Sequence, residues 1–234
     1  MVDAQRLDQR YYLESMKKSP AKLPHQPLDH RPVHVTYRLA GSLPKAALKT
    51  ISARHEACKA ELEIKAKTHP GILQSGVYAS ELFSLNARYE LDIDEALHTI
   101  ASGPFYLQDS DLAHEIIDSW LFLQKESAVY VYAVCVMGNH VHALIRAPDG
   151  LDTVDIGALM NRHKAHTARV CNKLIGKTGT QFWEHFYFDR TVHRGKFERV
   201  MWYVLNNPVK SRLVEDWQDW AGTYLNPDFE ALFC

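Results

Sequence analysis

The sequence lacks the long apolar segments that would place it in a membrane. No stretch approaches the roughly 18 to 20 uninterrupted apolar residues of a membrane-spanning helix. Residues 1–18 are polar and contain no apolar core of a secretory signal. These two absences predict a cytoplasmic protein with no membrane partner.

Cysteine is scarce, and its spacing argues against two classes of protein. The four cysteines lie far apart in the chain, at Cys58, Cys135, Cys171 and Cys234. The sequence therefore has neither zinc-knuckle spacing nor an evident disulfide framework. Cys135 lies in an apolar run, where a free cysteine behaves as a small hydrophobic residue of the core.

The chain also lacks a large net charge, since its formal charge is −1. The charges are nevertheless unevenly distributed. Residues 160–212 carry eleven Lys and Arg against three Asp and Glu, whereas residues 89–126 carry nine acidic residues and one basic residue. This asymmetry favours one surface that suits a polyanion such as nucleic acid. Two solvated helix faces of opposite sign would give the same pattern.

Apolar residues are plentiful enough for a sizeable core. The 234 residues, of which 46% are hydrophobic, predict one domain with insertions or at most two domains. We expect three parts: a polar N-terminal arm, a main domain and a C-terminal tail, at residues 1–31, 32–214 and 215–234. Residues 45–104 are interpreted as a helical insertion into the main domain. It begins with a long helix over 45–68 that has only a thin apolar stripe, and continues with short helical pieces.

The main domain alternates between strand and helix patterns. The strand patterns, which alternate apolar and polar residues or are rich in Val and Tyr, cover residues 33–39, 129–137 and 140–145. The helical patterns, each with one apolar face, cover about 112–123, 153–175 and 196–207. Pro208 is expected to end the last helix, and the aromatic run 182–190 is a strand or a loop.

The residues His140-Val141-His142 begin the strand predicted over 140–145. Residues i and i+2 of a strand point to the same face, so both imidazoles are expected on the exposed face of the sheet. Two adjacent imidazoles are a natural half of a divalent-metal site. The spacing is also compatible with one core histidine and one surface histidine.

Tyr203 lies outside the apolar stripe of the last predicted helix. It falls roughly 60° beyond the edge of that stripe, so the core does not require it. Asn207 lies four residues further on, on the same face. Its amide could be a third metal ligand beside a tyrosine nucleophile. A boundary tyrosine and a turn-forming asparagine would give the same pattern.

Several segments of the chain, taken in their order along the sequence, resemble a known family. The segment from Met137 to Ile145, the aromatic run 182–190 and the segment from Tyr203 to Lys210 are similar to the single-tyrosine HUH transposases. More specifically, these segments resemble the REP-associated tyrosine transposases and their insertion-sequence relatives. Residues 35–44 resemble the family's first strand, and the resemblance covers about 32–44 and 104–214. Gly138 departs from it, because the family commonly has proline there.

The resemblance implies both a fold and an activity. The implied fold is α+β, a ferredoxin-like (RRM-like) antiparallel sheet with helices on one face. The implied activity is that of a metal-dependent endonuclease and strand transferase on single-stranded or hairpin DNA, with Mg²⁺ or Mn²⁺ and a 5′-phosphotyrosine intermediate. By position, Tyr203 would be the nucleophile, His140 and His142 metal ligands, and Asn207 the third ligand.

The basic segment suggests where DNA would bind. The helix over 153–175 carries basic residues suited to the phosphate backbone, and the aromatic run offers rings that could stack on unpaired bases. The residues expected to contact DNA are Arg162, Lys164, Arg169, Lys173, Trp183, Tyr187 and Arg190. The same aromatic rings could instead fill the core.

Three other functions remain open at this point. A catalytically inactive hairpin-binding protein of the same fold would retain the same residues. A metal hydrolase would need a further ligand soon after His142, and no carboxylate occurs before Asp149. An RNA-binding module would carry aromatic motifs that residues 129–136 lack. A homodimer is compatible with the sequence, which does not determine the oligomeric state.

Overall fold

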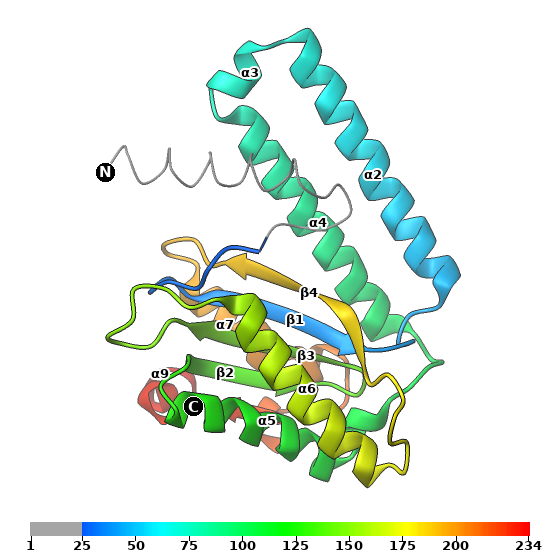
Figure 1. Ribbon diagram of the computed structural model, residues 1–234, viewed down its shortest axis with the longest axis vertical. Coiled ribbons are helices and arrows are strands. Elements are labelled where there is room, and N and C mark those ends of the chain that lie inside the picture. The colour runs from blue at the N-terminus through cyan, green and yellow to red at the C-terminus, as the bar shows by residue number, and fades with distance from the viewer. Residues whose placement is uncertain (1–24) are drawn as a thin grey trace. The chain divides into compact units, whose positions relative to one another are not determined.

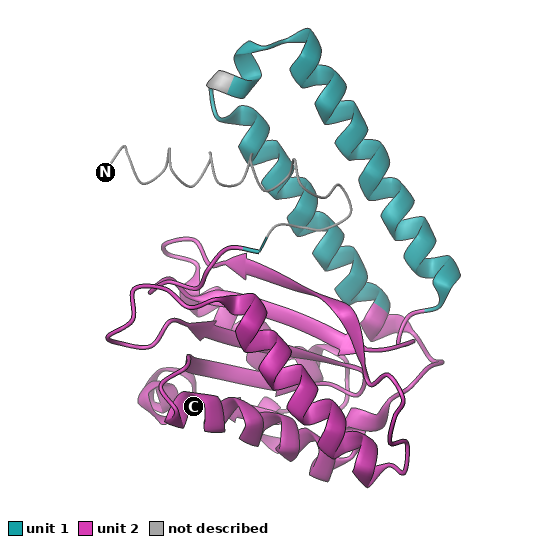
Figure 2. Ribbon diagram, viewed as in Figure 1, with its two compact units in different colours: residues 1–25, 44–96 teal, residues 26–43, 97–234 magenta. Residues whose placement is uncertain are grey.

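The computed structural model describes residues 25–234. The described residues divide into two compact units (Figure 2): Pro44–Ala96 with His25, and Gln26–Leu43 with Leu97–Cys234. Most of the predicted N-terminal arm lies outside the described residues. Among the described helices, none has the length and apolar character needed to cross a membrane.

The first unit is built from a pair of helices, α2 (Lys45–Thr68) and α4 (Val77–Thr99), which the short α3 (Gly71–Gln74) connects. The long helix predicted over 45–68 is confirmed, whereas the short pieces expected after it form one continuous helix. Polar side chains join the two helices along their length, in the pairs Ser52–Tyr89, His55–Asn86 and Lys65–Glu81. These pairs supplement an apolar stripe that is thin, as predicted.

The second unit contains one antiparallel sheet, with strands in the order β4-β1-β3-β2-β5 (Figure 1). Its strands are β1 (Val33–Leu39), β2 (Tyr130–Val136), β3 (His140–Arg146), β4 (Trp183–Thr191) and β5 (Thr223–Leu225). Helix α5 (Ser110–Lys125) lies between β1 and β2 in the chain, and α6 (Ile156–Leu174) between β3 and β4. The βαββαβ succession and the order 4-1-3-2 are those of a ferredoxin-like fold, so the predicted fold class is confirmed.

Both faces of the sheet are covered. On one face Val141, Ala143 and Ile145 pack in the main core beneath α5 and α6. On the other, α7 (Phe197–Leu205) packs its apolar stripe against Leu144 and β2. Strand β1 is consequently buried along its whole length, rather than half-buried as its alternating pattern predicted.

A buried polar network fixes β1 to α5 and α6. The His163 ring is hydrogen-bonded through Nε2 to the Tyr37 hydroxyl (2.7 Å) and through Nδ1 to Ser119 Oγ (2.9 Å). Trp120 Nε1 donates to the same tyrosine hydroxyl at 3.0 Å. Burial lowers the pKa of His163 to about 3, which keeps the ring neutral. This histidine is therefore a structural part of the core.

The C-terminal part of the chain belongs to the sheet unit. Strand β5 comes from the predicted tail and pairs with β2, and the Phe233 side chain is buried in the second core cluster. Pro208 does not end the helical conformation, because the short helix α8 (Asn207–Lys210) begins at this point with proline in its first turn. Proline is tolerated there because the missing N–H would have no partner inside the helix.

Candidate metal and tyrosine site

His140 and His142 project from the same face of β3, as the strand spacing predicted, but that face is not exposed. The two residues are 1% and 0% exposed, because α7 and its flanking segments cover this side of the sheet. Their rings lie at nearly a right angle with centroids 4.8 Å apart. The pair is therefore a buried, closely packed one.

A hydrogen bond at Nδ1 orients the ring of His140. Asn139 Oδ1 lies 2.6 Å from this nitrogen, and Asn139 Nδ2 donates to the carbonyl of Leu97 at 3.2 Å. The second bond fixes which way the amide points, so Nδ1 of His140 is the donor. Its Nε2 then carries the lone pair that a metal would use.

The ring of His142 is held in the same way by two residues of β1. Its Nδ1 lies 3.1 Å from His34 Nε2 and 3.3 Å from Thr36 Oγ1, and the His34 ring stacks on it with centroids 5.2 Å apart. Sequence reasoning did not identify His34. The alternation of β1 placed it on the face opposite the apolar core, but that face was taken to be exposed to solvent.

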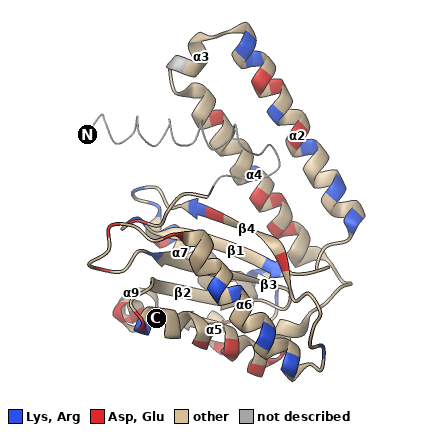
Figure 3. Cartoon of the chain, in the orientation of Figure 1, with Lys and Arg blue, Asp and Glu red and all other residues tan. Residues whose placement is uncertain are grey.

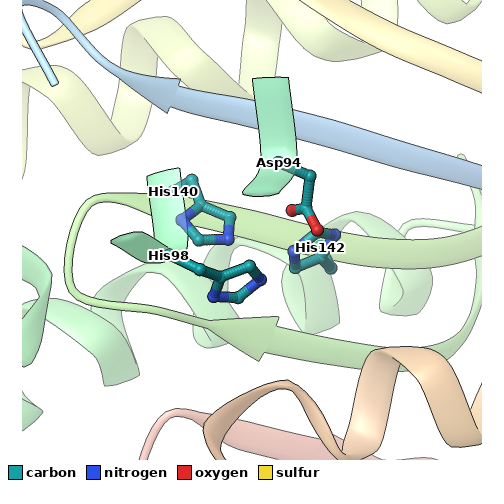
Figure 4. Close-up of side chains that lie close together, drawn as sticks. All are labelled: Asp94, His98, His140 and His142. Atoms are coloured by element: carbon teal, nitrogen blue, oxygen red, sulfur yellow. The ribbon is translucent and has the colours of Figure 1, made fainter. Parts of the chain in front are cut away.

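A third histidine, His98 in the last turn of α4, completes the cluster. Its Nδ1 lies 2.6 Å from Ser211 Oγ, and its ring is edge-on to that of His140 at 5.1 Å. One ring nitrogen from each of His98, His140 and His142 lies within 4.8 Å of one from each of the others (Figure 4). These side chains could hold a metal ion. Asp94 precedes His98 by one turn of the same helix, so both project from one face of α4.

Tyr203 lies on the same side of the sheet as the histidines. Its ring is edge-on to those of His142 and His34, with centroids 5.7 and 5.6 Å away. The ammonium of Lys210 lies 5.5 Å from its ring centroid. Tyr187, a second tyrosine of the sheet unit, pairs with Tyr37 and packs against the main core on the opposite face. Of the two, only Tyr203 is beside the histidines.

Asn207 is buried next to the tyrosine. It is 1% exposed, and its Nδ2 donates to the backbone carbonyl of Tyr203 at 2.7 Å. Within the part of the chain that the structure describes, its side-chain oxygen has no hydrogen-bond partner. A buried acceptor of this kind is costly unless something else satisfies it, which is compatible with a metal ligand.

The basic residues expected to bind DNA lie mainly on α6, where Lys and Arg gather while Asp and Glu gather on α5 (Figure 3). Arg162, Arg169 and Lys173 are exposed, but α6 covers the face opposite the histidines. Lys164 donates instead to the carbonyls of Glu184 and His185 at 2.6 and 3.0 Å, and burial lowers its pKa to about 8. It therefore anchors β4 to α6.

Two of the rings that could either stack on bases or fill the core pack against the core. Trp183 is 5% exposed and its Nε1 donates to Thr167 Oγ1 at 2.9 Å, so it is a core residue and cannot offer a ring to DNA. Tyr187 is partly buried between the core and α6, and burial raises the pKa of its hydroxyl. Phe186, between them on the edge strand, is 53% exposed.

Two arginines lie on the histidine face of the sheet. Arg190 of β4 is the cross-strand neighbour of His34, and Arg38 of β1 is that of His140. The buried guanidinium of Arg38 is 3.3 Å from the Glu184 carboxylate and donates to Ser42 Oγ at 3.2 Å. Arg190 is thus the predicted DNA-contacting residue that lies on the side of the candidate site.

Fold and site together define a class: an α+β domain that gathers buried histidines and a tyrosine on one face of an antiparallel sheet. Residues 105–207 match the model of the family described as "Transposase IS200 like". That segment, which contains His140, His142, Tyr203 and Asn207, is therefore similar to the IS200-like transposases. The family resemblance predicted from the sequence is confirmed.

A solved structure described as "Structure of the REP associates tyrosine transposase bound to a REP hairpin" aligns with a TM-score of 0.44 and 14% identity. The alignment covers 86% of this chain and 79% of that chain. No curated relative matches the sequence.

Proposed function

We propose that this protein is a metal-dependent, single-stranded DNA endonuclease and strand transferase that uses Tyr203 as its nucleophile. The observation that carries the proposal is the position of the Tyr203 ring, which is edge-on to His142 beside a cluster of buried imidazoles. The transposase family of residues 105–207 supplies the substrate class. Hairpin DNA at repetitive palindromic sites is the proposed target, and the cytoplasm the proposed location.

The donor set fits a divalent metal. Nδ1 of His140 and Nδ1 of His142 are both occupied by hydrogen bonds, which leaves Nε2 of each ring as the ligand atom. Asn207 adds a buried amide oxygen. Mg²⁺ or Mn²⁺ bound by these residues would polarise a phosphate and offset the charge that develops during attack.

The proposed reaction is a transesterification. The Tyr203 oxygen attacks a backbone phosphorus and releases its proton, and the bond from phosphorus to the 3′-oxygen breaks. The 3′-oxygen takes up a proton and leaves as a hydroxyl, while the 5′-phosphate stays on the tyrosine. A second 3′-hydroxyl can reverse the step and join a new strand, so no nucleotide hydrolysis is needed.

Basic side chains around the site would hold the DNA. Lys210 beside the tyrosine and Arg190 on β4 are suited to phosphates close to the cleaved bond. The exposed cations of α6 would contact flanking DNA on the other side of the domain. They are Arg162, Arg169 and Lys173.

A labelled-strand assay tests the proposal. Single-stranded DNA from the flanks of the gene is incubated with the full chain and Mn²⁺ or EDTA, and resolved on a denaturing gel. A label at the 3′ end should appear in a slow covalent band, and a label at the 5′ end in a shortened free strand. Peptide mass spectrometry should place the nucleotide on residues 200–210, a tryptic peptide with a single tyrosine. Hairpin binding without any adduct would contradict the nuclease and favour a binding protein.

His34 is expected to act as a positioning residue through His142. Replacing His34 with Ala removes a partner of His142 Nδ1, and loss of such a partner lowers metal affinity by about 10- to 100-fold. His34→Gln keeps an acceptor there and should restore most of the affinity. Isothermal titration with Mn²⁺ measures the metal affinity of both variants. Equal losses in the two variants would indicate that His34 contributes packing alone.

A further inference from the structure

We infer that His98 is a third imidazole ligand, and that the completed site selects transition metals such as Mn²⁺, Co²⁺ or Zn²⁺ over Mg²⁺. The inference rests on the metal-dependent function proposed above and deepens it. It assigns a ligand to α4, a helix that arises from the inserted segment and lies before the family match begins. It also narrows the proposed cofactor from Mg²⁺ or Mn²⁺ to metals that bind imidazole more readily than Mg²⁺ does.

The end of α4 is tied to the sheet at two points. Asn139 Nδ2 donates to the carbonyl of Leu97, and His98 Nδ1 is hydrogen-bonded to Ser211 Oγ. Since Asn139 also accepts from His140, one amide side chain connects the backbone beside His98 to the ring of His140. Leu97 and His98 belong to the compact unit that holds the sheet.

All three imidazole rings have the same hydrogen-bonding arrangement. His98, His140 and His142 each have Nδ1 engaged by a neighbouring side chain, and this leaves Nε2 as the shared ligand position. Such fixed partners are typical of metal-binding histidines.

The separations suit a single ion. Two nitrogens that bind one metal at about 2.1 Å can lie at most about 4.2 Å apart. The nitrogens of the three histidines lie within 4.8 Å of one another, so side-chain shifts of less than about one ångström would bring them into coordination range. The rings meet nearly at right angles, at 84° and 86°, and thus approach from different directions.

The type of ligand atom, nitrogen or oxygen, determines which metal ions the site prefers. Mg²⁺ demands oxygen ligands in a near-octahedral shell and gives up water reluctantly. Neutral imidazole suits later divalent metals, and affinity rises from Mn²⁺ through Co²⁺ toward Cu²⁺. Three imidazoles supply three nitrogens, which outnumber the oxygens that Asp94 and Asn207 can add. The balance of donors therefore disfavours Mg²⁺.

A cobalt titration tests the metal preference without reference to activity. The full chain is stripped with chelator and titrated with Co²⁺, whose visible absorption reports the ligands bound to it. We expect one Co²⁺ per chain, displaced by an equivalent of Zn²⁺ and retained in the presence of a ~1,000-fold excess of Mg²⁺. Displacement of Co²⁺ by Mg²⁺ at comparable concentration would overturn the preference.

Variants test the ligand itself. His98→Ala should raise the Kd for Co²⁺ by more than about 100-fold, since loss of a supporting partner alone costs 10- to 100-fold. His98→Phe keeps a ring against His140 but offers no nitrogen, and should show the same loss if the first variant folds poorly. His114→Ala, an exposed histidine of α5, is the matched control and should bind as the wild type does.

Different results would contradict the His98 ligand and the proposed nuclease activity. Unchanged cobalt binding in both His98 variants overturns the role of His98, even if the wild type forms the tyrosine adduct. Weakened binding in those variants supports it, even if no DNA is cleaved. An adduct assay at saturating Mn²⁺ on the same preparations shows which case holds.

Discussion

Replacement of Tyr203 by Phe is expected to abolish covalent attachment to DNA, a loss of more than about 10³-fold in cleavage rate, because it removes the proposed nucleophilic hydroxyl. The variant keeps the ring that lies against His142 and His34. Removing one hydroxyl from a partly exposed residue should change the free energy of unfolding by less than about 1 kcal/mol. Cleavage would thus be lost from a folded protein.

The matched control is Tyr187→Phe, which removes the same hydroxyl from the opposite face of the sheet. Its adduct yield should equal that of the wild type, and both variants should retain hairpin binding in a gel-shift assay. The denaturing gel with a 3′-labelled strand reports the adduct directly. A covalent band that persists in Tyr203→Phe and disappears in Tyr187→Phe would show that the nucleophile lies on the other face.

Most of the fold could be predicted because its elements have local signatures. The alternation of residues 33–39, the apolar run before Gly138 and the single apolar face of α6 each follow from neighbouring residues. Strand β5 has no such signature, since its three residues are defined by pairing with β2. A short edge strand of this kind depends on tertiary contact, which no local pattern records.

The candidate site was predictable only where its residues lie close together in the sequence. His140 and His142 are two residues apart on β3, and Asn207 follows Tyr203 by one helical turn. His34 and His98 reach the cluster through the pairing of β1 with β3 and through the end of α4. Their distances in sequence from His142 carry no signal. The polar side of β1 was the available signal for His34. It was ambiguous, because alternation alone does not distinguish a solvated face from a buried site.

Replacing Trp183 with Ala is expected to lower the free energy of unfolding by about 3–5 kcal/mol, the range for truncating a large aromatic residue in a core. The indole is 5% exposed, and it packs edge-on against Tyr37 at 4.9 Å between ring centroids. The substitution leaves a cavity and removes the donor to Thr167 Oγ1. Urea unfolding followed by circular dichroism measures the change.

Phe186→Ala on the same strand is the matched comparison, because this ring is 53% exposed. It should alter stability by no more than about 0.5 kcal/mol. An exposed aromatic on an edge strand can still stack on an unpaired base, which is worth about 1–3 kcal/mol per base, so this variant is the one expected to weaken binding of single-stranded DNA. Fluorescence anisotropy with a labelled oligonucleotide measures DNA binding and so distinguishes a role in binding from a role in stability. A stable Trp183→Ala protein with weakened DNA binding would indicate that the indole is exposed and contacts DNA, which would contradict its place in the core.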